Sequence, residues 1–589
     1  MGQAMRVALA ILFSLLASAG VAAGQDADER PNIVLILVDD AALMDFGAYG
    51  GEAATPNIDA LAQRGAWFTQ YRTSPLCSPT RAMLLTGLDN HLTGVATIPE
   101  VLPEEHAGQP GYTMALEPGV LTLADRLGSI GYRTLMSGKW HLGETPEEMP
   151  QNHGFDRSFA LAASGADNWA DKSYMPYYAD APWYEDGAPA KLPEDFYSSQ
   201  FIVDQMISYL ADTPSEQPFF AYLPFQAIHI PVQAPDKFIA NYDGRFDEGW
   251  HEMRRARYER AQTLGLVPEG VPYAPIPQTD RRWESLSDEE RTLYAARMEV
   301  NAAMLEAMDH HIGRLIQYLE SQSKLEKTIF VVTSDNGPEP NRGDYDQRLE
   351  FWMGLNGYHT ELDGIGGIGS WGFIGPEWAN AAASPSQLYK FYATEGGVRA
   401  PLIISGPGVT PARVDSPAMV TDVAPTLLDM VTDGGSSALT EMTGRSLLPV
   451  LSGAVESVYA DDDIRAIEVS GNSALYLGDY KITRSMPPVG DGDWRLYNLA
   501  LDPGETQDIS ELSPDIKDIL VQAFEGYAEE FGVLAMPAGF DSHQQITKNT
   551  MKRLQMRYGW MLILIVLLLL GLVYGLWRGG RWIAGRVRG

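Results

Sequence analysis

The sequence predicts an α/β fold built on a large mixed, mostly parallel sheet with helices on both faces. Short runs of β-branched and leucine residues, such as residues 32–38 (NIVLILV), have the continuous hydrophobicity of strands that are buried on both faces. Segments with helical periodicity, among them residues 121–131 and 296–322, lie between these runs. Strands that alternate with helices are typical of a parallel sheet.

Polar and charged residues follow four of the predicted strands at the point where each strand ends. The strands are residues 32–38, 132–136, 219–223 and 328–333, and the residues that follow them are Asp39, Asp40, Lys139, His141, His229, Asp335 and Asn336. Ligands of parallel sheets gather outside the carboxyl ends of the strands, so we expect these side chains to meet in one cleft.

A metal ion is the expected occupant of part of this cleft. A single Asp after a strand is more often a turn residue than a ligand. Two adjacent carboxylates at one strand end and an Asp-Asn pair at another repel each other in a shared cleft unless a cation lies among them. Ligand sets made only of oxygen atoms favour calcium or magnesium over zinc or copper.

The only cysteine, Cys77, lies in the stretch SPLCSPTR between two prolines. Pro79 suits the first turn of a helix that continues to Gly87, which puts Cys77 just before a helix N-terminus, where free N–H groups favour an anion. Arg81, about one turn on, points a guanidinium toward the same place. A thiolate nucleophile with a histidine base and a loop thiol without a chemical role are both compatible with this pattern. No internal disulfide is possible.

The formal net charge is −34, which argues against nucleic acid or an anionic membrane surface as a partner. A solvated acidic surface accounts for most of this charge.

The first residues have the pattern of a signal peptide. Arg6 precedes an apolar run from Val7 to Leu16, and the small residues 21–23 follow where a signal peptidase cuts. The apolar run has about ten residues, whereas a membrane-spanning helix needs about twenty. Residues 1–24 are therefore predicted to be a signal peptide, and the chain is predicted to be exported.

A second apolar segment, residues 559–577, contains no charge and is about 28 Å long as a helix, close to the thickness of the bilayer core. Aromatic residues flank it, and the arginine-rich residues 578–589 follow as a cytoplasmic tail. A lipid-anchor signal would end the chain with its hydrophobic segment, which this sequence does not do. We expect a transmembrane helix that holds the rest of the protein outside the cytoplasm. The absence of an Asn-x-Ser/Thr sequon favours a bacterial inner membrane facing the periplasm.

Several separated motifs, in order along the chain, resemble the type I sulfatases. The stretch from Cys77 to Arg81 matches their C-x-P-x-R core, and GYRTLMSGKWHLG (131–143) is similar to their second signature. TSDNG, TEGGVRAP (394–401) and WRLYNLALDPGETQDIS (494–510) match further family segments. The region before TEGGVRAP is similar to the long bacterial arylsulfatases. The similarity covers Pro31 to Ser510, and the transmembrane segment departs from the soluble members.

The resemblance implies an alkaline-phosphatase-like catalytic domain over residues 31–455. A small α+β domain over residues 456–540, with a short antiparallel sheet and a packing helix, is expected to follow. Residues 541–558 are then a juxtamembrane segment, either a helical stalk or a flexible linker.

The resemblance also implies a mechanism. In this family the motif cysteine is oxidised to formylglycine during export, so Cys77 would be the substrate of a maturation enzyme. One hydroxyl of the hydrated aldehyde attacks sulfur, and the second expels the sulfate, which a serine cannot do. One calcium ion is implied, with Asp39, Asp40, Asp335, Asn336 and a hydroxyl of residue 77 as ligands.

The remaining roles are carried over by position. Arg81 and Lys139 would hold the formylglycine and the oxygens near the metal. His141 would take the proton of the second hydroxyl. His229 and Lys390 would face the leaving oxygen.

The expected activity is hydrolysis of aryl or small alkyl sulfates. A phosphate or phosphonate monoester hydrolase of the same superfamily and a non-catalytic sulfate-binding protein with an unmodified cysteine are the alternatives. Aromatic residues between 160 and 200 either line an aryl pocket or pack ordinarily; they are Trp169, Tyr174, Tyr177, Tyr178 and Trp183.

Overall fold

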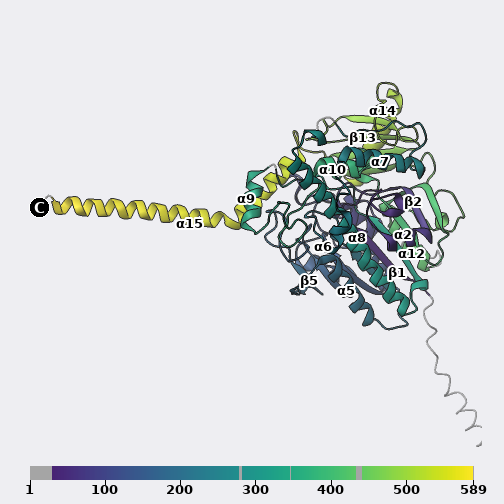
Figure 1. Cartoon of the computed structure of the whole chain (residues 1–589), viewed down its shortest axis with the longest axis horizontal. Helices are drawn as coiled ribbons and strands as arrows, with labels where there is room; N and C mark the ends of the chain where they lie inside the picture. Colours follow the sequence, from purple (N-terminus) through teal and green to yellow (C-terminus); the bar gives the residue numbers. More distant parts are fainter. Residues whose placement is uncertain (1–29, 278–280, 345, 433–440, 588–589) are drawn as a thin grey trace, which may run out of the picture.

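A computed structural model describes residues 30–277, 281–344, 346–432 and 441–587 of the chain. Figure 1 shows a large body from which one long helix projects at the C-terminal end. The predicted signal peptide, residues 1–24, lies outside the described residues.

A ten-stranded sheet runs through the described part of the large domain. In spatial order its strands are β10 (Ala412–Met419), β2 (Gly65–Arg72), β9 (Leu402–Ser405), β8 (Thr328–Ser334), β1 (Asn32–Val38), β7 (Phe219–Pro224), β3 (Arg133–Lys139), β4 (Arg157–Leu161), β5 (Trp183–Glu185) and β6 (Ala188–Pro189). From β8 to β4 neighbouring strands are parallel, whereas β9 runs antiparallel to both of its neighbours. The predicted mixed, mostly parallel sheet is confirmed.

Helices cover both faces of this sheet. The described helices of the large domain are α2 (Pro56–Gln63), α3 (Cys77–Thr86), α4 (Leu123–Ser129), α5 (Ser198–Ala211), α6 (Asp236–Ile239), α7 (Trp250–Thr263), α8 (Asp288–Ser321), α9 (Gln347–Leu355), α10 (Gly375–Ala382), α11 (Glu395–Val398), α12 (Val423–Thr432) and α13 (Leu448–Leu451). The helix expected from residue 296 begins earlier, at Asp288, because Ser287 and Glu290 form a capping box there.

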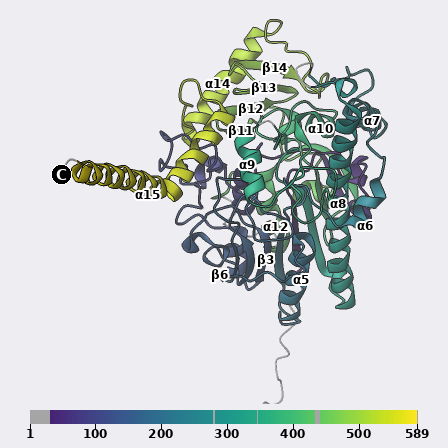
Figure 2. The same cartoon turned by 60° about the vertical axis from the view of Figure 1, so that its left-hand side comes forward.

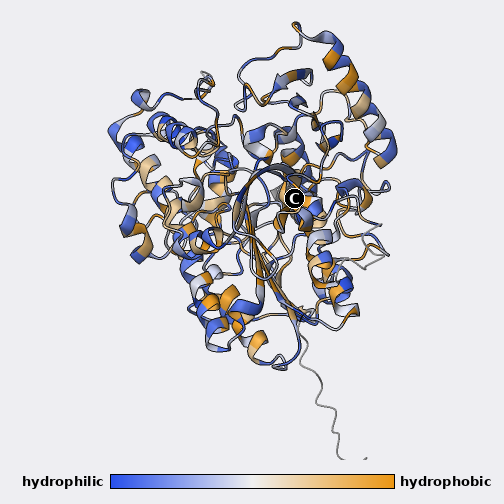
Figure 3. Cartoon of the chain, turned by 90° about the vertical axis from the view of Figure 1, so that its right-hand side faces the viewer, coloured by the Kyte–Doolittle hydropathy of each residue, from blue (hydrophilic) through white to orange (hydrophobic). Residues whose placement is uncertain are grey.

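The alternation of side chains along β1 divides the core into two layers. Val34, Ile36 and Val38 pack into one hydrophobic cluster, which includes residues of α5 and α8. Ile33, Leu35 and Leu37 pack into the other cluster, which includes residues of α3, α4 and α12. In Figure 3 the strands at the centre are hydrophobic (orange), and hydrophilic residues (blue) predominate on the outer loops and helices.

A second, four-stranded antiparallel sheet follows in the chain. It consists of β11 (Arg465–Val469), β12 (Asn472–Leu477), β13 (Tyr480–Arg484) and β14 (Trp494–Asn498). Helix α14 (Pro514–Phe531) packs on it through Leu520 and Phe524. The small domain thus has the expected sheet and packing helix.

The two sheets are joined by buried ion pairs. Glu395 of α11 pairs with Arg72 of β2 at 2.9 Å and with Lys481 of β13 at 3.0 Å. Lys481 also pairs with Glu505 at 2.7 Å. These side chains are almost fully buried, so each charge depends on its partners for compensation.

The chain ends in α15 (Ser542–Val587), a single helix with two different parts. Its first part lies against the large domain, and the remainder projects away from it (Figures 1 and 2). Within the described residues this is the one helix that is long and apolar enough to cross a membrane. Of residues 541–558, for which the sequence predicts either a helical stalk or a flexible linker, those from Ser542 onward are helical and docked on the domain.

Candidate active site

The ends of β1 and β8 bring four oxygen-bearing side chains together. The two strands are parallel neighbours, with Val38 opposite Ser334, so Asp39-Asp40 and Asp335-Asn336 leave the sheet side by side. The backbone N–H of Asp40 donates to Oδ1 of Asp335 at 3.1 Å, and Nδ2 of Asn336 donates to Oδ1 of Asp40 at 2.6 Å. Asp40 has φ = 66°, a left-handed conformation that is uncommon outside glycine and typical of strained functional turns.

Helix α3 brings Cys77 and Arg81 to the same place. The helix begins at Cys77 itself, one residue earlier than expected, with Leu76 as its N-cap and Pro79 still in the first turn. Arg81 is fully buried and donates to Oδ2 of Asp335 from Nε and from a terminal nitrogen, at 3.1 and 2.8 Å. A terminal nitrogen also lies 3.6 Å from Oδ2 of Asp39. Arg81 therefore holds the two strand ends together.

Strand β3 ends in a lysine, and a histidine follows two residues later. Nζ of Lys139 lies 2.5 Å from Oδ2 of Asp39, and both side chains are fully buried. His141 has φ = 55°, and its backbone carbonyl accepts a hydrogen bond from the hydroxyl of Ser78 on α3. Within the described part of the chain, neither ring nitrogen of the buried His141 has a hydrogen-bond partner. The imidazole is therefore free to accept a proton from a bound group.

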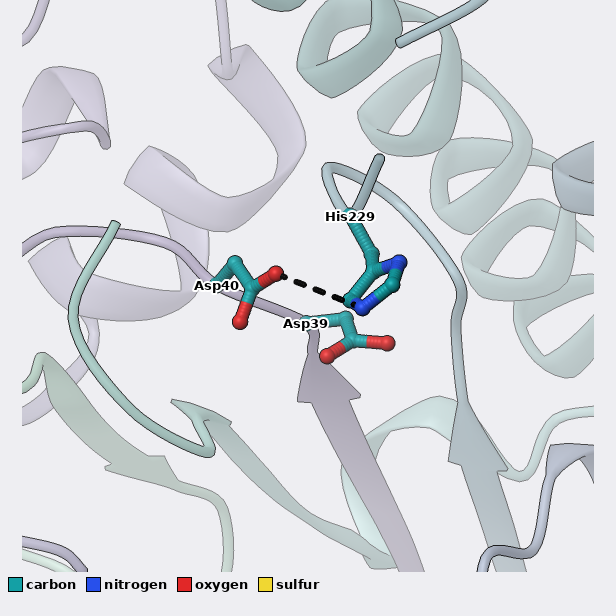
Figure 4. A group of neighbouring side chains, drawn as sticks. All are labelled: Asp39, Asp40 and His229. Carbon is teal, nitrogen blue, oxygen red and sulfur yellow. Dashed lines mark ion pairs between the residues drawn. The ribbon is translucent and has the colours of Figure 1, made fainter. Parts of the chain in front are cut away.

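His229 follows β7 and faces the end of β1 (Figure 4). Its Nε2 lies 3.8 Å from Oδ2 of Asp40 and 4.0 Å from Oε2 of Glu339. Nδ1 of His229 lies 2.6 Å from the carbonyl oxygen of Ile230. Because a carbonyl oxygen can only accept a hydrogen bond, Nδ1 is the donor, and Nε2 faces the site.

Lys390 joins the cluster from a distant part of the chain. Its Nζ lies 2.8 Å from Oδ1 of Asp40 and 2.8 Å from Oε2 of Glu339. The structure thus brings all of the sequence-predicted site residues into one cluster.

Burial sets the protonation of the cluster. It raises the pKa of Asp40 and of Asp335, an effect that nearby carboxylates reinforce. It raises the pKa of Cys77 to about 12, although Lys139 and Lys390 oppose this. It lowers the pKa of His141 and of His229, and neighbouring lysines lower both further.

Lys390 behaves differently from the other buried groups. Burial alone lowers its pKa, but Asp40, followed by Cys77 and Glu339, raises the pKa well above its ordinary value. The histidines are therefore neutral near pH 7, whereas Lys390 carries a charge.

The cluster fits a divalent cation. Ligand atoms of Asp39, Cys77 and Asp335 lie within 4.8 Å of one another, as do those of Asp39, Asp40 and His229. Oδ1 of Asp39 and Oδ1 of Asn336 are buried and have no hydrogen-bond partner among the described residues. Two unpartnered oxygens beside buried carboxylates are ligands that a hard cation such as calcium accepts.

The cluster forms the polar end of a cavity of about 400 Å³. Cys77, His141, His229 and Lys390 line that end. The remaining wall comes from the loop around Tyr174, from α9 and its preceding loop, and from the first part of α15. A cavity of this size takes a small organic molecule in addition to an anionic group.

Sequence reasoning missed Glu339 and most of the cavity wall. Glu339 stands three residues after Asn336, so its position beyond the same strand end was an available signal. Of the five aromatic residues considered for a pocket, Tyr174 lines this cavity, whereas Trp169 and Trp183 pack in or against the core. Tyr177 instead contacts α15 through Arg553.

A mostly parallel sheet with carboxylates, lysines, histidines and a helix N-terminus at one end of its strands defines an alkaline-phosphatase-like hydrolase. Within that class the sequence identifies the family, because the family model described as Sulfatase matches residues 31–433. The chain belongs to the sulfatase family, and it is a sulfate ester hydrolase.

Individual relatives agree with this assignment. An uncharacterised sulfatase of Schizosaccharomyces pombe is 36% identical over 541 residues, which cover 88% of this chain and 96% of the relative. The arylsulfatase of Klebsiella aerogenes is 36% identical over 462 residues, which cover 77% of this chain and 96% of the relative. The solved structure of Ps i-CgsB in complex with k-i-k-neocarrahexaose shares the fold, with a TM-score of 0.61 and 21% identity over 89% of this chain and 99% of that chain.

Proposed function

We propose that this protein is a membrane-anchored arylsulfatase-like enzyme that uses a formylglycine derived from Cys77 and one calcium ion. The observation that carries the proposal is the position of Cys77, buried at the polar end of the cavity with its sulfur close to Asp39 and Asp335. Burial raises the pKa of Cys77 to about 12, so without a bound cation the thiol is not activated as a thiolate near neutral pH, which agrees with the proposed conversion to formylglycine.

Calcium would be held by Asp39, Asp40, Asp335 and Asn336, with residue 77 at the edge of its shell. Bound there, the ion would polarise a sulfate oxygen and lower the pKa of a hydroxyl beside it. Asp39, Asp40, Asp335 and Glu339 are four carboxylates that face the three cations of Arg81, Lys139 and Lys390. A divalent cation therefore changes the formal balance of the cluster from one negative charge to one positive charge, which suits an anionic ester.

The side chains of the site have separate tasks. Arg81 and Lys139 fix the carboxylates of Asp39 and Asp335 through the contacts described above. Nε2 or Nδ1 of His141 takes a proton from the hydroxyl that releases sulfate, since neither nitrogen is engaged elsewhere. The charged Lys390 stabilises the leaving oxygen. His229 faces the leaving oxygen with Nε2, the nitrogen that its hydrogen bond to Ile230 leaves without a proton, so it passes a proton to that oxygen only after Nε2 has taken one from the attacking hydroxyl.

The proposed location has two supports. The apolar part of α15 is long enough to cross a bilayer, and the segment before it is docked on the domain. Together with the predicted signal peptide, this helix supports a catalytic domain outside the cytoplasm, and we propose a bacterial periplasm. The maturation enzyme that forms formylglycine is the second partner.

Mass spectrometry of the tryptic peptide from Thr73 to Arg81 tests the central step. Protein from its native host is expected to carry an aldehyde at residue 77, and purified enzyme is expected to hydrolyse 4-nitrophenyl sulfate. Cys77→Ser is expected to accumulate a sulfated serine after incubation with substrate, because a serine lacks the second hydroxyl. An unmodified Cys77 in fully active enzyme contradicts the proposal, and a preference for 4-nitrophenyl phosphate favours a phosphate monoester hydrolase instead.

A further inference from the structure

The first part of α15, residues 543–554, forms a wall of the active-site cavity. The side chains involved are His543, Ile546, Thr547, Thr550, Met551 and Leu554. Their spacing alternates between three residues and one, so they lie on a single face of the helix. The residues that carry the predicted anchor therefore begin inside the catalytic centre.

A second face of the same helix fixes it to the domain. Nδ2 of Asn549 donates to the carbonyl oxygens of Glu100 and Leu102, both at 2.9 Å. Arg553 pairs with Glu144 at 2.9 Å and donates to the hydroxyl of Tyr177 at 3.0 Å. This part of α15 is a built element of the cavity and not a free stalk.

Helix α9 supplies apolar side chains to the same cavity. Leu349, Phe351, Trp352 and Leu355 line it, although Phe351 is 69% and Leu355 is 71% exposed. Figure 1 places α9 where α15 leaves the body of the protein. Exposed apolar residues gathered beside a cavity mark a surface that contacts an apolar partner or ligand.

The charged side chains of this part of the wall are paired locally. Arg342 pairs with Asp344 at 2.8 Å, and Arg348 pairs with Asp346 at 3.2 Å. With the proposed divalent cation bound, the sulfate end of the cavity has a net positive formal charge, whereas the end formed by α9 and α15 offers mainly apolar contacts. A ligand that matches both ends is an amphiphile with an anionic head.

The position of the cavity along α15 adds a second argument. Leu554 is the last cavity residue of α15, and the apolar segment begins five residues later at Gly559. At about 1.5 Å per residue, the two positions are at most about 8 Å apart along the helix. The headgroup layer of a bilayer is about 5–8 Å thick, so the α15 side of the cavity lies at the level of the membrane surface. Tyr558 and Trp560, both exposed, suit that interface.

We propose that the substrates are sulfate esters of apolar alcohols, whose tail lies between α9 and α15 while the sulfate occupies the site at Cys77. This inference rests on the proposed sulfatase function and on the insertion of α15 in a membrane. Ile546, Met551 and Leu554, together with Phe351 and Trp352, are then the residues that determine specificity. The tail enters from the membrane surface, where such amphiphiles concentrate.

The test uses the full-length protein in phospholipid nanodiscs and a series of hexyl, octyl and decyl sulfates below micelle formation. Each added methylene that becomes buried is expected to raise kcat/KM about fourfold. The double variant Met551→Gln/Leu554→Gln is expected to reduce this to less than about twofold per methylene. The substrates partition into the bilayer equally in both experiments, so a difference between the two proteins comes from the cavity. The ratio of the decyl to the hexyl rate is compared because it does not depend on the amount of folded enzyme.

Met556→Gln is the matched control. Met556 lies on the same helix, is 67% exposed and is not part of the cavity wall, so the chain-length dependence is expected to remain that of the wild type. The inference is overturned if the wild-type rates do not vary with chain length, or if the double variant shows the same dependence as the wild type. In either case, hydrolysis of 4-nitrophenyl sulfate leaves the proposed function intact. A protein that hydrolyses no sulfate ester overturns both.

Discussion

His91 is expected to lose a stabilising proton as the pH rises from about 6.5 to about 9, so the free energy of unfolding is expected to fall over this range. Nδ1 of this buried histidine lies 2.9 Å from Asp89, and Nε2 lies 2.8 Å from Glu468 of β11 in the small domain. Burial lowers the pKa of His91, but the hydrogen bonds to Asp89 and Glu468 raise it to about 9. The imidazolium donates from both nitrogens and thereby ties the two domains together.

The magnitude follows from linkage between protonation and folding. An unfolded histidine has a pKa of about 6.5, so the two values differ by about 2.5, which corresponds to about 3 kcal/mol. Because the folded pKa is the higher one, this stabilisation is fully present below about pH 6.5 and is lost as the pH rises through about 9. Tyr527 donates to Asp89 in the same cluster, but its pKa is raised well above 10, so it does not titrate in this window.

Equilibrium urea unfolding at several pH values, compared between the wild type and His91→Gln, measures the effect. The stability difference between the two proteins is expected to shrink by about 3 kcal/mol between pH 6 and pH 9.5. His106→Gln is the control, because His106 is buried but its ring nitrogen faces the backbone carbonyl of Ala535. If the wild type and His91→Gln lose stability in parallel over this range, the assigned role of the imidazolium is refuted.

Three further outcomes are expected. Calcium at about 100 times its dissociation constant is expected to stabilise the wild type by about 2.7 kcal/mol, measured as a higher unfolding midpoint than in the presence of a chelator. An equal stabilisation of Asp39→Asn by calcium speaks against the metal site. Lys481→Met leaves Glu395 and Glu505 buried without their shared cation and is expected to lower the free energy of unfolding by about 3–5 kcal/mol. An unchanged midpoint of urea unfolding contradicts a stabilising role of this lysine. His141→Ala lowers kcat for 4-nitrophenyl sulfate about 10²–10⁴-fold, and rapid-quench mass spectrometry detects covalent sulfate on residue 77; its absence argues against a role in sulfate release.

The sequence carried enough information for the central sheet because each buried strand is a short hydrophobic run. The site residues were predictable for the same reason, since the carboxyl ends of neighbouring parallel strands lie side by side, as Val38 and Ser334 do. The order of the strands and the antiparallel direction of β9 were not predictable, because they depend on how distant segments pair.

The cavity wall escaped prediction for a different reason. The side chains of α9 and of the first part of α15 are ordinary amphipathic patterns, and periodicity says which face is apolar but not what that face contacts. Glu339 illustrates the same limit, since its 2.8 Å ion pair with Lys390 joins residues fifty-one positions apart through a fold that no local pattern specifies.

The docking of α15 has a consequence for how the enzyme changes in evolution and in the laboratory. If α15 anchors the protein in a membrane as proposed, a chain that stops after Phe540 loses the anchor and one wall of the cavity, whereas a chain that stops after Tyr558 loses the anchor alone. Truncation before Ser542 would therefore change both membrane attachment and substrate preference, whereas truncation after Tyr558 would change membrane attachment alone. A lineage that sheds its anchor upstream of Ser542 has to rebuild a wall before it recovers its original choice of ester.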